Sequence, residues 1–178
     1  RSVVANGGIY MWKDGRKNWD TLTAVFDYGP PDDASAGFQV TFSSRQHNGD
    51  ENPAEIYYSN GGELNLNTNK VSPHGGLTKK MAEAMNMQEN LLPEYNLADA
   101  AVKAVASANT GGDTLTSNHV RNWMECIRSR KQPNAPVEAG YYHSIANIMT
   151  TAASRTGYKA TFDEKTQEVM AGGKIFKY

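Results

Sequence analysis

Cysteine is nearly absent from this sequence. The single cysteine among the 178 residues, Cys126, cannot form a disulfide within the chain, so the fold must rely on packing. One thiol fits the cytoplasm, where disulfides are rare, but it also fits a secreted or periplasmic protein. The cysteine content therefore leaves the compartment open between the cytoplasm and the periplasm.

Long apolar runs and long basic runs are also missing. No apolar segment approaches the roughly 20 residues that a membrane-spanning helix needs, and no Lys/Arg run marks a nucleic-acid-binding face. The 18 Lys and Arg nearly balance the 19 Asp and Glu, for a net charge of -1. We therefore expect neither a membrane nor a nucleic acid as partner. The 39% of hydrophobic residues suffices for a single domain, residues 1–178, with its own core.

The usual cofactor and catalytic motifs are missing as well. There is no G-x-G-x-x-G turn for a dinucleotide, no G-x-x-x-x-G-K-[ST] phosphate loop and no G-x-S-x-G nucleophile elbow. Cys126 is expected to be a half-buried structural thiol. The histidines lack zinc-ligand spacing; they are His47, His74, His119 and His143. We expect no catalytic residue, no metal site and no nicotinamide-binding site in this chain.

The first third of the chain has the period of two that is typical of half-buried strands. The segments TLTAVFDY (21–28) and GFQVTFSS (37–44) alternate apolar and polar residues, and SVVANGGIY near the start predicts a further strand. Asn60-Gly61-Gly62, within AEIYYSNGGELNLNT (54–68), predicts a hairpin because Asn and Gly tolerate positive φ.

From about residue 69 the pattern changes to that of helices, which we predict at 78–89, 95–107, 119–130 and 138–156. Gly157 is placed to end the last one. Strands first and helices after them predict an α+β fold, a mainly antiparallel open sheet with helices packed on one face. The helical residues expected in the core are Trp123, Met124, Ile127, Ile145, Ile148 and Met149. We expect them to pack on the sheet face that carries Leu22, Phe26, Phe38 and Phe42.

One stretch of the strand region combines aromatic rings with closely spaced charges. GGIYMWKDGRKNWDT (7–21) brings Trp12, Lys13, Asp14 and Arg16 together, a composition that suits a polar, ring-shaped ligand such as a sugar. SRQHNGDEN (44–52) follows a strand and offers Arg45, His47 and Asn48 as donors. The alternative is structural: Trp12 and Trp19 would support the sheet edge, the charges would be solvated, and the second segment would be a polar turn.

Two stretches resemble the C-terminal half of bacterial Gfo/Idh/MocA oxidoreductases, the glucose–fructose oxidoreductase and inositol dehydrogenase type. They are GGIYMWKDGRKNWDT and HVRNWMECIRSRKQPNAPVEAGYYHSIANIMTTAASRTGYKATFDEKTQEV, in which CIRSRKQPN is the most specific run. The resemblance covers most of the chain and is weakest at about 70–115. It implies an α+β domain that shapes a sugar pocket and mediates oligomerisation, following an N-terminal Rossmann domain that binds NAD or NADP.

In such proteins a hydride passes between the nicotinamide and a sugar or cyclitol carbon. We accordingly expect this chain to be a fragment of a longer polypeptide, to bind a sugar-like small molecule, and to be inert without its Rossmann domain. The candidate substrate-binding residues are Trp12, Lys13, Asp14, Arg16, Arg45 and Asn48. The alternatives are a stand-alone carbohydrate-binding or assembly module that lacks catalysis, and a fragment of an NAD-dependent glycosidase of the same family.

Self-association is the last expectation. Helices can cover one face of the sheet only, and the strands carry just two charges for the other face, Asp27 and Glu63, which suits packing against a second copy. The residues assigned to this open face are Thr21, Thr23, Val25, Gln39, Thr41, Ser43, Asn65 and Asn67. We expect a dimer or tetramer formed through it. A Thr-rich surface that simply faces water is the alternative.

Overall fold

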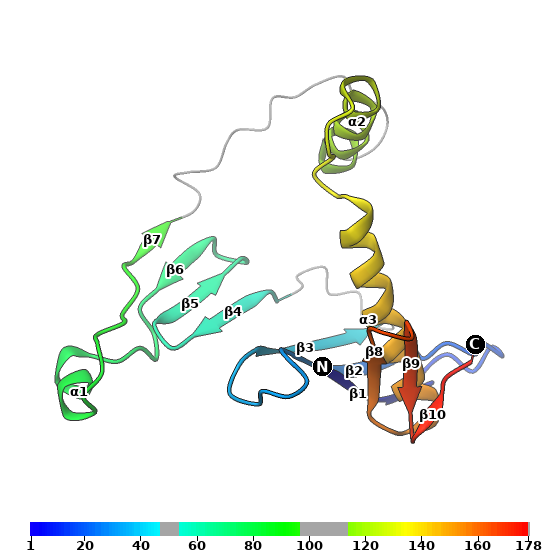
Figure 1. Ribbon diagram of the computed structural model, residues 1–178, viewed down its shortest axis with the longest axis horizontal. Coiled ribbons are helices and arrows are strands. Elements are labelled where there is room, and N and C mark those ends of the chain that lie inside the picture. Colours follow the sequence, from blue (N-terminus) through cyan, green and yellow to red (C-terminus); the bar gives the residue numbers. More distant parts are fainter. Residues whose placement is uncertain (47–53, 97–113, 178) are drawn as a thin grey trace. The chain divides into compact units, whose positions relative to one another are not determined.

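A computed structural model describes residues 1–46, 54–96 and 114–177. The chain divides into two compact units, residues 1–49 with 115–178 and residues 50–114 (Figure 1). Each unit has its own antiparallel sheet. The predicted fold class, α+β with a mainly antiparallel open sheet and helical cover on one face, is confirmed.

The first unit is built on a six-stranded sheet with the order β10-β9-β8-β1-β2-β3. Its strands are β1 (Ser2–Gly8), β2 (Thr21–Tyr28), β3 (Phe38–Arg45), β8 (Ala160–Asp163), β9 (Glu168–Ala171) and β10 (Lys174–Ile175). The three strands predicted near the start of the chain are all present. In register, Val3 pairs with Phe26 of β2 and with Ala160 of β8, so the C-terminal strands extend the sheet beyond β1.

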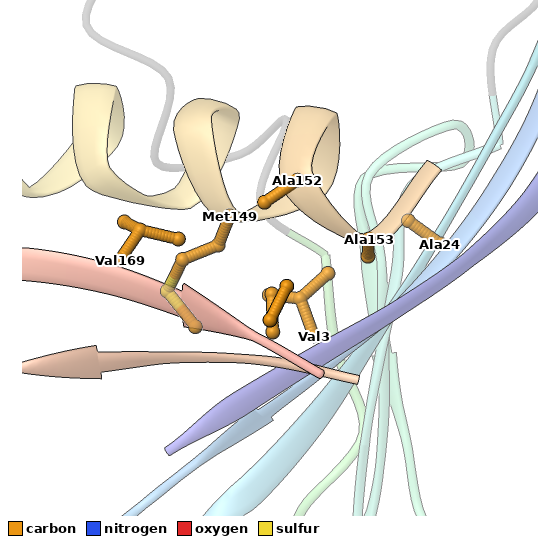
Figure 2. Close-up of a cluster of buried hydrophobic side chains, with 8 residues drawn as sticks. Val3, Ala24, Met149, Ala152, Ala153 and Val169 are labelled. Carbon is orange, nitrogen blue, oxygen red and sulfur yellow. The ribbon is translucent and has the colours of Figure 1, made fainter. Parts of the chain in front are cut away.

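Helix α3 (Val137–Thr156) covers one face of this sheet, where it packs on β1, β8 and β9. The helix ends at Gly157 as predicted, with φ at 72° and the Gly157 amide donating to the Ala153 carbonyl at 2.9 Å. Figure 2 shows the side chains between helix and sheet. The buried cluster consists of Val3, Ala24, Met149, Ala152, Ala153, Ala160, Val169 and Ala171. Its many alanines let the helix backbone lie close to the strands.

The core predicted from the sequence is only partly right. Met149 is buried, and Ile145 and Ile148 are half-buried against the cluster. Helix α2 (Thr114–Ser129) has the predicted apolar stripe, but Trp123, Met124 and Ile127 are 55%, 42% and 45% exposed, so this stripe is not core.

The sheet face that was predicted to lie under the helices is only partly covered. Phe38 and Phe42 lie on the same face as Ala24, yet they are 63% and 49% exposed. The physical reason is the extension of the sheet by β8–β10. Because β8–β10 extend the sheet beyond β1, α3 packs over β1, β8 and β9 instead of over β2 and β3.

The second unit contains a four-stranded sheet with the order β4-β5-β6-β7 and one short helix. Its elements are β4 (Ile56–Ser59), β5 (Gly62–Asn65), β6 (Lys70–Ser72), α1 (Lys79–Ala84) and β7 (Tyr95–Asn96). The predicted hairpin is confirmed, with Asn60 and Gly61 between the paired ends Ser59 and Gly62.

Two of the predicted helices are not found as predicted in this unit. The helix predicted at 78–89 is confined to α1, and the one predicted at 95–107 begins with the strand β7, because Tyr95 pairs with Val71. Its remainder lies outside the described residues. Asn65 and Asn67, which were expected on the open face, do not belong to the six-stranded sheet: Asn65 ends β5 of the four-stranded sheet, and Asn67 comes two residues later.

On β2 and β3, the sheet face opposite α3 carries small, mostly uncharged side chains, whereas on β8 and β9 the same face carries Asp163 and Glu168. Thr23, Thr41 and Ser43 are exposed there, and the Thr23 and Ser43 hydroxyl oxygens lie 3.3 Å apart. At one end of this face, Arg1 donates two hydrogen bonds of 2.8 Å to Asp27. The charge of Asp27 on β2 is therefore neutralised within the chain.

Candidate functional site

The connection between β1 and β2, residues 9–20, is held by a buried carboxylate; we call it the 9–20 loop. Asp20 is 1% exposed and accepts hydrogen bonds from the backbone N–H groups of Tyr10, Met11 and Trp12 at 3.0, 2.9 and 2.9 Å. The Thr21 hydroxyl donates a further bond at 3.1 Å. Because three successive amides bind one carboxylate, the backbone of the loop is fixed at residues 10–12, which carry large side chains.

The surroundings of Asp20 keep it ionised. Burial, the largest single influence, acts to raise its pKa, but the amides of Trp12, Tyr10 and Met11 and the Thr21 hydroxyl together lower the pKa well below the usual range. A carboxylate that accepts several N–H bonds is stabilised in its charged form. Asp20 therefore serves as a fixed anion that orders the loop.

Gly7 and Gly8 give two aromatic rings room to lie on the β1 backbone. A Cβ atom on Gly7 would collide first with the backbone carbonyl of Thr21 and would lie 2.8 Å from Trp19 Cε3, and one on Gly8 would lie 2.7 Å from Tyr10 Cε1. Distances below 3.0 Å are far shorter than carbon–carbon van der Waals contact. The absence of side chains at Gly7 and Gly8 therefore lets the Trp19 and Tyr10 rings lie against the β1 backbone.

Three of the predicted residues come together on the loop. The Arg16 guanidinium donates to Asp14 from Nε at 2.8 Å and from Nη2 at 2.6 Å, and it lies 5.6 Å from the Trp12 ring centroid. The hydrogen bonds that Arg16 donates hold the pKa of Asp14 well below its usual range, and the same bonds to the Asp14 carboxylate raise the pKa of Arg16. The cluster is a preformed bidentate ion pair beside an aromatic ring.

The other three predicted residues are placed differently. Lys13 donates from Nζ to the carbonyl of Ile9 on the same loop. Arg45 is exposed at the end of β3, paired in register with Thr21, so it lies at the end of the sheet from which the 9–20 loop projects. Within the described chain, no hydrogen bond or ion pair joins Arg45 to the Asp14–Arg16 pair. Asn48 lies outside the described residues.

Sequence reasoning missed the residues that organise the loop. Asp20 and Tyr10 are not among the residues predicted from the sequence, and Trp19 is predicted only as a support of the sheet edge. A signal for Asp20 was present, because Asp side chains accept backbone N–H bonds in turns and Asp20 directly precedes a strand. The glycine pair beside two aromatic rings was the corresponding signal for Tyr10 and Trp19.

Elsewhere in the first unit, an apolar hollow of about 460 Å³ lies between α3 and the β8–β10 strands. Ile145, Ile148, Phe162, Val169 and Phe176 line much of it, so it continues the core cluster outward. None of the predicted site residues borders it. In the described ranges, no group of His, Cys, Asp and Glu side chains has a metal-binding arrangement. Nor is any described helix long and apolar enough to cross a membrane.

Comparison with known proteins returned no match to any family model, curated protein or solved structure.

Proposed function

We propose that this chain is the substrate-binding and assembly part of an NAD(P)-dependent oxidoreductase of the Gfo/Idh/MocA type, acting on a sugar or cyclitol. The observation that carries the proposal is the 9–20 loop, with Trp12, Asp14 and Arg16 gathered on a backbone that Asp20 fixes. Arg45 lies at the same end of the sheet. Polar groups that are already in place discriminate between hydroxyl patterns at little entropic cost.

The cofactor of such a reaction does not fit the residues of this chain. A dinucleotide needs a glycine-rich turn that lets the backbone approach its pyrophosphate, and no G-x-G-x-x-G occurs among the 178 residues. We therefore assign NAD or NADP to a separate Rossmann domain of the same polypeptide. This chain's part in the reaction is to bind and orient the hydroxyl-bearing ring.

Arginine and lysine substitutions in the complete protein test this role. Arg16→Ala and Lys13→Ala should each lower kcat/KM for the sugar by about tenfold to a hundredfold, the range for losing a hydrogen bond from a charged donor. Arg16→Lys should recover little, because an ammonium cannot form the bidentate pair. Steady-state kinetics with a thermal unfolding curve for each variant provide the measurement.

Lys17→Ala is the matched control, since Lys17 is exposed on the same loop. Its kinetics should stay close to those of the unchanged protein. Full activity in Arg16→Ala and Lys13→Ala would instead make the 9–20 loop a structural connection between two strands. Sugar binding without any nicotinamide-dependent turnover would favour the stand-alone carbohydrate-binding module.

We also infer self-association through the sheet face opposite α3. The inference is supported by the exposed hydroxyl side chains of Thr23, Thr41 and Ser43 and by the neutralisation of Asp27 by Arg1. A solvent face ordinarily carries Lys and Glu, which prevent sheets from pairing. A symmetric dimer is the commonest closed arrangement for such a face.

Lysines introduced at Thr23 and Thr41 should convert the dimer or tetramer into a folded monomer, because two buried ammonium groups per copy would face one another. Sedimentation velocity at several micromolar concentrations measures this, with circular dichroism as the check on folding. A control with the same added charge places lysines at the exposed positions Gln88 and Ser129 and should remain associated. An unchanged protein that is monomeric throughout would contradict the inference.

A further inference from the structure

Two aromatic side chains of the 9–20 loop are open to a ligand, and they are not equivalent. Trp12 is 45% exposed and already has the Arg16 guanidinium 5.6 Å from its ring centroid. Tyr10 is 64% exposed. The Arg16 cation lies over one face of the Trp12 ring and competes with a ligand for that face. Tyr10 is therefore the better of the two as a stacking surface.

Tyr10 is also held in place by contacts of its ring and of its backbone. Its ring lies against Gly8, where a Cβ atom would be 2.7, 3.3 and 3.4 Å from the ring atoms Cε1, Cδ1 and Cζ. Its backbone N–H is bound by Asp20 at 3.0 Å. With both the ring and the backbone anchored, little conformational freedom remains to be lost on binding, which is the advantage of tyrosine in recognition surfaces.

The geometry points to Tyr10 as the ring against which the C–H face of the proposed sugar or cyclitol stacks. This inference rests on the proposed function. The face of an aromatic ring is electronegative and attracts the weakly positive hydrogens of C–H bonds. Pyranoses and cyclitols whose hydroxyls are all equatorial present such hydrogens on both faces and direct their hydroxyls outward.

The charged groups of the same loop suit that outward rim of hydroxyls. Lys13 uses one of its ammonium donors on the Ile9 carbonyl, and an ammonium has three. The Asp14–Arg16 pair follows two residues after Trp12 and combines acceptor with donor. Stacking on Tyr10 would hold the sugar ring, while these groups would distinguish its hydroxyl pattern.

Calorimetric titration of the complete protein with methyl β-D-glucopyranoside and with scyllo-inositol tests the inference. Both probes carry only hydrogens in their axial positions. Tyr10→Ala should weaken binding by about tenfold or more, whereas Tyr10→Phe should keep the affinity within about threefold, because phenylalanine preserves the ring. Gly8→Ala should weaken binding as Tyr10→Ala does, since the added methyl group displaces the ring.

Tyr158→Ala is the control, because Tyr158 is equally exposed, at 63%, but lies beyond the end of α3. Heteronuclear NMR spectra establish that each variant is folded. Binding of either probe with the same affinity in Tyr10→Ala would overturn the assignment of Tyr10 and leave the proposed function standing. Failure of both probes to bind the folded, unsubstituted protein would contradict the proposed substrate class and the assignment together.

Discussion

Replacing Asp20 by asparagine is expected to release the 9–20 loop and to lower the melting temperature by several degrees. Asparagine has nearly the same shape, but one carboxylate oxygen becomes an NH2 group that faces the N–H groups now bound to Asp20. Buried donors left without an acceptor are costly. The loop should therefore leave its fixed conformation even though no side chain has been shortened.

Amide chemical shifts of Tyr10, Met11 and Trp12 report the loop directly, and thermal unfolding reports stability. Asp32→Asn is the control, because Asp32 is exposed in the connection between β2 and β3. It should change neither measurement. Amides of the loop that keep their shifts in Asp20→Asn would show that the carboxylate is not what orders it.

The pH dependence has a definite sign. Because the folded-state pKa of Asp20 lies below its unfolded value, the stabilisation is complete above the unfolded pKa, which is about 4 for aspartate. It is lost as the pH falls below that value toward the folded pKa. Between about pH 6 and pH 3, the unfolding midpoint of the unchanged protein should accordingly fall more steeply than that of Asp20→Asn. Parallel curves would contradict the assignment of a lowered pKa.

The parts of the fold that local patterns specify were predicted from the sequence. Alternation of apolar and polar residues located β2 and β3, because successive side chains of a strand point to opposite faces of the sheet, although only β2 contributes a buried residue, Ala24. Asn60-Gly61-Gly62 located the hairpin and Gly157 located the end of α3; Gly62 and Gly157 have positive φ, which restricts the choice of residue.

The parts that depend on distant partners were not predicted. The pattern of helices after strands omitted β8 to β10, although Gly172-Gly173 and the ATFD and EVMA segments mark short strands. Once these strands extend the sheet, α3 packs over them and β1, and the aromatic residues of β3 stay exposed. Periodicity identifies an apolar helix face but does not say which surface covers it.

The candidate site divides in the same way. The composition of the 7–21 stretch identified Trp12, Asp14 and Arg16, which the fold does bring together. The function of Asp20 depends on three amides that lie eight to ten residues earlier, so residue type alone does not reveal it. The placement of the Tyr10 and Trp19 rings depends on how closely they approach Gly8 and Gly7, which is a property of the folded backbone.

Truncating Met149 should cause the largest loss of stability of any single substitution considered above. Met149 is 6% exposed and lies in the cluster between α3 and the sheet (Figure 2). Met149→Ala removes most of its side chain from that cluster and leaves a cavity, which typically costs about 2–5 kcal/mol. Urea unfolding followed by circular dichroism measures the change in the free energy of unfolding.

The same substitution at Met124 is the matched control. The helical pattern predicts both methionines to be core residues, but Met124 on α2 is 42% exposed. Met124→Ala should therefore change the free energy of unfolding by no more than about 0.5 kcal/mol, the usual range for surface substitutions. Comparable losses in both variants would mean that the α2 stripe is packed in solution, as the sequence pattern predicts. A large loss in Met149→Ala alone would establish α3 as the helix that holds the sheet.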